Sequence, residues 1–187
     1  TIQYNQDSNT LVDVNEFECC VKLAQAHPLD IDSLHQAAEL YRGSFLEGFA
    51  IPDSIPFEEW LLVKRERLER LVNWVFQRLA DEYELAGEYA KAVEFAKRQL
   101  HLNPWREEVH QQIMRCLYYL GQRSAAIAQY EACCSALKAD LGLEPSQETQ
   151  TLYIQICEDQ LPIPPTPPRF LQRLSLTVVD KPDFVFR

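Results

Sequence analysis

The stretch of sequence that decides the fold reads Leu79-Ala80-x2-Tyr83, Gly87-Glu88-Tyr89, Ala92-Val93, Leu100, Leu102 and Pro104. Small and large apolar residues recur at helical spacing on both sides of the glycine, and a proline closes the stretch. A glycine just past a helix end takes a left-handed backbone conformation that costs other residues roughly 1–2 kcal/mol. The stretch therefore predicts two helices that pack as a hairpin through a glycine turn.

The same pattern returns after 34 residues as Ile113-Met114-x2-Leu117, Gly121, Ala126-Ile127 and Tyr130. Its closing proline, Pro145, comes seven residues late, so the second helix of this unit or the loop after it is longer than standard. A period of 34 residues is that of the tetratricopeptide repeat. The pattern predicts an all-α fold built as a tetratricopeptide-like array of helical hairpins, an α-solenoid. Such arrays hold partners and rarely perform chemistry.

Composition limits the classes of partner. The 187 residues include only five glycines, which favours helices over sheet, and the net charge is −10. Residues 161–187 carry four basic and two acidic side chains, so residues 1–160 carry −12. A body with this charge repels the phosphates of nucleic acids. The polar N-terminal sequence is unlike a signal peptide and no apolar run is long enough to span a membrane, so we expect a soluble, cytoplasmic protein.

No motif for chemistry is found. The six cysteines include the adjacent pairs Cys19-Cys20 and Cys133-Cys134 but no C-x2-C spacing, so we interpret them as packing residues of a reduced protein. The four histidines lack metal-ligand spacing, and the glycines of the loop from Gly43 to Gly48 are followed by Phe49-Ala50 where a phosphate-binding loop needs lysine and a hydroxyl. We therefore predict no catalytic residues, no metal and no cofactor; an active site assembled only in three dimensions is the alternative.

The chain divides into three parts by pattern. Residues 1–12 contain short β-prone segments and are predicted to be a hairpin remnant of an upstream domain. The helical domain is assigned to residues 13–160, with helices expected near residues 13–27, 30–42, 57–86, 88–101, 106–120, 122–139 and 146–160. Residues 161–187 begin with five prolines within seven residues, which favours an extended, semi-rigid linker. The tail beyond them forms either another hairpin or part of a following domain.

Several motifs outside the repeat carry a family resemblance. They are Leu40-Tyr41-Arg42-Gly43-Ser-Phe-Leu-Glu-Gly48-Phe49, Trp60, Arg65-Glu-Arg-Leu68, Gly87-Glu-Tyr89, Pro104-Trp-Arg-Glu-Glu108 and Leu141-Gly-Leu-Glu-Pro-Ser146. Together they resemble the bacterial transcriptional activation domain of the antibiotic-pathway activators of the AfsR, DnrI and RedD type, over roughly residues 12–160. In that family the domain follows a winged-helix DNA-binding domain whose closing hairpin precedes Val-Asp-x-x-x-Phe, here Val12 to Phe17.

The resemblance implies a non-catalytic regulatory module. It implies self-association or contacts with the transcription machinery, RNA polymerase or a sigma factor, and DNA binding only through the missing upstream domain. No membrane or small-molecule site follows from it. A generic tetratricopeptide adaptor that binds peptides is the alternative, although such an adaptor has no reason to carry the motifs at 40–49 and 141–146. The basic stretch Lys64 to Arg70 is interpreted as a solvated helix face with the i,i+4 pairs Glu66–Arg70 and Arg65–Glu69.

A candidate partner surface follows from the repeat itself. The first-helix positions that line the inner groove of such arrays, counted from Asn73 and Glu107, are Gln77, Asp81, Glu84, Gln111, Arg115 and Tyr118. Asp81 and Glu84 have the wrong sign to clamp a peptide's terminal carboxylate, which weakens a chaperone-adaptor interpretation. Arg115 and Tyr118 lie on one side of their helix, a pair of residue types enriched where proteins bind proteins. Alternatively, Tyr118 is part of the core and Arg115 pairs with Asp81 or Glu84.

Overall fold

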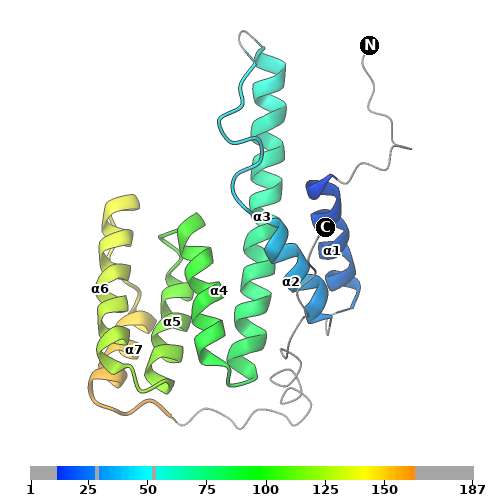
Figure 1. Ribbon diagram of the computed structural model, residues 1–187. Helices are drawn as coiled ribbons and strands as arrows, with labels where there is room; N and C mark the ends of the chain where they lie inside the picture. The colour runs from blue at the N-terminus through cyan, green and yellow to red at the C-terminus, as the bar shows by residue number, and fades with distance from the viewer. Residues whose placement is uncertain (1–11, 28–29, 52–53, 163–187) are drawn as a thin grey trace, which may run out of the picture. The chain divides into compact units, whose positions relative to one another are not determined.

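All regular structure that the computed structural model describes is helical (Figure 1). The described residues are 12–27, 30–51 and 54–162. Within them lie α1 (Asp13–Ala26), α2 (Ile31–Leu40), α3 (Ile55–Leu85), α4 (Tyr89–Leu102), α5 (Glu107–Tyr119), α6 (Arg123–Asp140) and α7 (Gln147–Cys157). The predicted all-α class is confirmed for this part of the chain, and none of its helices is long and apolar enough to cross a membrane. Residues 1–11 of the predicted hairpin remnant (residues 1–12) and the tail beyond Pro162 lie outside the described residues.

The helix boundaries follow the sequence pattern closely, with one exception at the start of α1. The pattern Asp13-x-x-Glu16 resembles a capping box, but Asp13 is the first helical residue, and Val12 before it provides no side-chain capping bond. The Ser146 side chain does cap α7, accepting a hydrogen bond from the backbone N–H of Thr149. The late proline of the second repeat reflects both a longer helix and a longer loop, since α6 has 18 residues against 14 in α4, and Pro145 lies further from the end of α6 than Pro104 does from the end of α4.

Glycine turns end α3 and α5 as the repeat predicts. Gly87 has φ +78° and Gly121 has φ +73°. After α3, the N–H of Glu88 donates to the carbonyl of Tyr83 at 2.9 Å, and the N–H of Gly87 donates to the carbonyl of Glu84 at 3.1 Å. The same two bonds close α5. This pair of bonds is the Schellman arrangement, which satisfies carbonyls that the helix end leaves without partners.

The chain forms two compact units, the first within Thr1–Phe76 and the second within Gln77–Arg187, and α3 contributes to both. In the first unit α1 packs against α2. The facing side chains Phe17, Val21, Leu34 and Ala37 are buried. Burying each of the larger side chains stabilises the folded state by about 1.5–3 kcal/mol.

The loop that carries the family motif is fixed to α3 in the first unit. Arg65 donates from Nε to the carbonyl of Phe45 at 2.7 Å and from Nη2 to that of Leu46 at 2.6 Å. The rings of Phe45 and Trp60 meet edge to face, 6.0 Å apart. The expected pair between Arg65 and Glu69 is therefore replaced by bonds to the loop backbone, which give the Phe45 carbonyl a partner and the Leu46 carbonyl a second one beside the Phe49 N–H.

The second unit contains the end of α3 and helices α4 to α7. Helix α5 packs against α4, α6 and α7, and Figure 1 shows α4, α5 and α6 side by side. Stacked rings of Tyr83 and Phe95, with centroids 5.8 Å apart, join α3 to α4. Ala92, Ala96 and Ile113 are fully buried, which is consistent with close helix approach at small residues.

Candidate partner-binding groove

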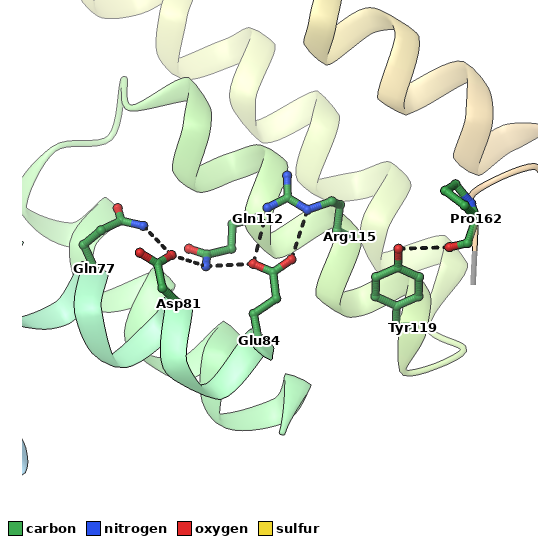
Figure 2. Close-up of polar contacts among 7 residues, drawn as sticks. All are labelled: Gln77, Asp81, Glu84, Gln112, Arg115, Tyr119 and Pro162. Carbon is green, nitrogen blue, oxygen red and sulfur yellow. Dashed lines mark hydrogen bonds and ion pairs between the residues drawn. The ribbon is translucent and has the colours of Figure 1, made fainter. Parts of the chain in front are cut away.

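Four polar side chains of α3 and α5 form one connected row (Figure 2). The Gln77 amide donates to Asp81 Oδ1 at 2.8 Å. From α5, the amide nitrogen of Gln112 donates to Asp81 Oδ1 at 3.0 Å and to Glu84 Oε2 at 2.9 Å. One amide therefore bridges two carboxylates that lie a helical turn apart. The predicted groove positions on α3 thus face the middle of α5.

Arg115 extends this row. Its Nε donates to Glu84 Oε1 at 3.0 Å and its Nη2 donates to Glu84 Oε2 at 3.3 Å. The exposed fractions of the two side chains are 35% and 21%, so the pair is only partly shielded from water. Arg115 therefore does pair with an acidic residue of α3, as the alternative interpretation of the sequence expected. The two-point geometry fixes the guanidinium plane at the rim of the groove.

The other two predicted residues bind α7 and its end instead. Gln111 donates to the Thr149 hydroxyl at 2.7 Å, and the Tyr118 hydroxyl donates to Asp159 Oδ1 at 2.7 Å. Tyr118 is half-buried and does not belong to the core. The hydrogen bond to Asp159 raises the pKa of Tyr118 above its usual value. The six predicted positions therefore separate into a row on α3 and α5 and two contacts at opposite ends of α7, Gln111 at its first turn and Tyr118 just past its last.

A cavity of about 530 Å³ lies beside the row. Its walls are Arg78, Asp81, Glu84, Leu85, Tyr89, Arg115 and Tyr119. The rings of Tyr89 and Tyr119 are 5.2 Å apart and form an aromatic side, and burial raises the pKa of both phenols. Cys116 lies behind this wall, where burial raises the pKa of its thiol to about 12, so it remains protonated at neutral pH.

The sequence did not single out Gln112. Its side chain is 3% exposed, and its Oε1 has no hydrogen-bond partner among the described residues. Position 112 lies beside Ile113 on the buried side of α5, where the repeat pattern assigns core residues. A glutamine at such a position was the available signal, because a buried amide requires polar partners.

A polar cluster at the start of α5 fixes α7. Glu107 accepts hydrogen bonds from the Ser146 N–H at 2.7 Å, from the Ser146 hydroxyl at 2.6 Å and from the Thr149 hydroxyl. Burial opposes the charged form, but these bonds outweigh it and lower the pKa of Glu107. His110 bonds the Pro104 carbonyl and Gln129, and burial lowers its pKa. We assign these groups to stability.

The remaining candidates for chemistry have structural contacts. Lys64 and Arg67 of the basic stretch both contact Glu18, at 2.8 and 3.3 Å, and Glu66 pairs with Arg70 at 2.9 Å as expected. The six cysteines are free thiols, and Cys20, Cys116 and Cys133 are buried. In residues 12–27, 30–51 and 54–162, no group of three His, Cys, Asp or Glu side chains is placed to hold a metal ion.

Comparison with known proteins identifies the class of domain. Residues 12–157 match the family model described as the bacterial transcriptional activator domain. Among solved structures, the chain is similar to Mycobacterium tuberculosis EmbR in complex with a low-affinity phosphopeptide, with a TM-score of 0.53 and 20% sequence identity. That alignment covers 81% of this chain and 39% of the EmbR chain, and at this identity it supports the fold alone. No curated protein matches this sequence.

Proposed function

Because this chain belongs to the bacterial transcriptional activator domain family, we propose that it is the non-catalytic interaction module of a bacterial transcriptional regulator in the cytoplasm. Its domain is assigned to residues 13–160, preceded by the hairpin of a winged-helix DNA-binding domain in residues 1–12 and followed by a linker and tail in residues 161–187. Self-association or contact with RNA polymerase or a sigma factor is the corresponding activity. The family match supports the regulatory role, and the groove supports the binding of proteins.

The helix ends support a tetratricopeptide-like array. Helix α7 ends with the same bonds as α3 and α5, because the N–H of Gln160 donates to the carbonyl of Gln155 at 2.9 Å and Asp159 has φ +58°. Asp159 follows Gly121 by 38 residues instead of 34, and the difference of four matches the extra length of α6 over α4. Helices α3, α5 and α7 thus occupy corresponding positions, with α7 in the place of a capping helix.

The single observation that carries the proposal is the polar row beside the cavity. Asp81, Glu84 and Arg115 are half-buried, yet they line the cavity. We assign the partner-binding surface to the predicted residues Gln77, Asp81, Glu84, Gln111, Arg115 and Tyr118, and the buried Gln112 holds Asp81 and Glu84 in place. Polar side chains held in place by neighbours lose little freedom on binding, which favours recognition at modest entropic cost.

Association measurements test this assignment. Binding of the full chain to purified RNA polymerase, with and without sigma factor, is measured by biolayer interferometry, and self-association by sedimentation velocity. Arg115→Ala is expected to weaken the interaction by about 1–3 kcal/mol, or roughly 5- to 150-fold. Arg70→Ala is the matched control, since it also removes one ion pair, here between side chains that are 68% and 66% exposed.

The outcomes separate the candidate functions. Loss of binding with Arg115→Ala but not with Arg70→Ala, at an unchanged thermal midpoint, supports the groove. If both variants bind RNA polymerase and self-associate like the wild type, the groove is structural and the assignment is wrong. Binding of acidic C-terminal peptides, with no binding to the transcription machinery, would instead favour the generic adaptor.

A further inference from the structure

The cavity wall contains one carboxylate that lacks a cation. Asp81 receives bonds from two neutral amides and forms no ion pair among the described residues. The two arginines of the wall are already paired: Arg78 contacts Glu82, and the Arg115 guanidinium is held by both carboxylate oxygens of Glu84. A partly buried carboxylate without a cation favours a ligand that donates hydrogen bonds and carries positive charge.

The aromatic side of the cavity defines the rest of the ligand. Tyr89 and Tyr119 form a wall, and Leu85 next to them is 56% exposed. Tyrosine faces bind the planar guanidinium of arginine, and aromatic-lined grooves bind proline in an extended left-handed helix. The chemistry of both sides fits an extended segment in which prolines precede an arginine.

This chain supplies such a segment at the cavity itself. The Tyr119 hydroxyl donates to the carbonyl of Pro162 at 3.1 Å, so the last described residue contacts the cavity wall (Figure 2). The next residues are Ile163-Pro164-Pro165-Thr166-Pro167-Pro168-Arg169. At about 3.1 Å per residue, the seven residues after Pro162 can span up to about 22 Å. Asp81 is one helical turn from Leu85, well within this reach.

Charge gives an independent argument for the same occupant. Residues 161–187 carry four basic and two acidic side chains, whereas the remainder of the chain carries −12. The first basic residues of this segment are Arg169 and Arg173, directly after the prolines. Attraction between a cationic segment and an acidic surface is strengthened when the two are joined by a short linker, because the effective concentration reaches the millimolar range.

We propose that residues 163–173 bind in this cavity of their own chain, with Arg169 against Asp81 and the prolines against Tyr89 and Tyr119. The segment then occupies the surface assigned above to partners and competes with them. This competition rests on the proposed function, but the binding of the segment does not.

Proteolysis of the full chain tests the proposal. Chymotrypsin cleavage after Phe170 is followed by mass spectrometry, and each rate is divided by the rate for a free peptide of the same sequence, residues 163–178. This ratio removes the effect of a substitution on the protease itself. We expect at least 10-fold protection in the wild type. Asp81→Lys should abolish it, whereas Glu131→Lys, the same charge change at an exposed position of α6, should not.

A charge exchange makes the test independent of folding. Arg169→Glu alters only the segment and should remove most of the protection, while the double variant Asp81→Lys/Arg169→Glu should restore it to within about threefold of the wild type. Equal protection in the wild type and Arg169→Glu overturns the proposal, as does no protection in the wild type. In that case, loss of polymerase binding or self-association by Arg115→Ala still supports the proposed function, so the two failures are distinguishable.

Discussion

Replacing Gly121 with alanine isolates the energy of the left-handed turn between α5 and α6. The glycine has φ +73°, and a Cβ built there meets no atom within 4 Å. No clash therefore contributes, and only the backbone strain remains. That strain costs about 1–2 kcal/mol for a residue with a Cβ, and reduced freedom of the unfolded chain offsets about 0.4–1 kcal/mol of it. We expect a net loss of roughly 1 kcal/mol in the free energy of unfolding.

Urea unfolding followed by far-UV circular dichroism measures this loss. With a slope of about 2 kcal/mol per molar urea, the midpoint should fall by roughly 0.5 M. Gly121→Asn is the matched control, because asparagine adopts the left-handed conformation more readily than alanine, and Asp159 already occupies it at the end of α7. An alanine variant with the wild-type midpoint, or an asparagine variant as unstable as alanine, would refute the account of the turn.

Three further predictions concern the second unit and the charge of the chain. Gly87→Val should lower the free energy of unfolding by about 1–2 kcal/mol or more, because a β-branched residue is forced to φ +78°; an unchanged denaturation midpoint contradicts this. The pKa of Glu107 is lower in the folded state than in the unfolded state. Its ionised side chain therefore stabilises the fold above the unfolded pKa of about 4.3, and this stabilisation is lost as the pH falls through the folded pKa. Glu107→Gln should therefore flatten the fall of the thermal midpoint below about pH 4.3. Finally, the chain should not bind duplex DNA at physiological salt, because its net charge is −10 and Lys64, Arg67 and Arg70 of α3 contact acidic partners; a mobility shift at micromolar concentration contradicts it.

The elements that the sequence predicted well are those set by local periodicity. Gly87 and Gly121 end helices because only glycine takes that conformation without strain, and the 34-residue spacing places Asp81 and Glu84 opposite α5. The position of α7 has no such signal. It depends on the extra turn of α6, and this is why Gln111 and Tyr118 contact α7 and its end instead of lining the row.

Gln112 and Arg65 were misjudged for a different reason. Helical spacing gives the direction of a side chain from its own helix but does not specify what stands opposite. Arg65 was paired with Glu69 one turn away, whereas the carbonyls of a loop about twenty residues earlier are its partners. Gln112 was not singled out, and its role follows only when two carboxylates of α3 lie within 3.0 Å of its amide.

The contact between Arg115 and Glu84 decides how the groove must be tested. Charge reversal by Arg115→Glu was the natural probe from sequence, since it should weaken association without lowering stability. In the structure this substitution places a second carboxylate against Glu84, and like charges at such a distance destabilise the fold by themselves. A double-mutant cycle with Arg115→Ala and Glu84→Gln, in which association is measured for all four proteins, separates the two contributions. If Arg115→Ala no longer weakens association in the Glu84→Gln background, Arg115 acts only by positioning Glu84; a loss that persists there assigns Arg115 a direct contact with the partner.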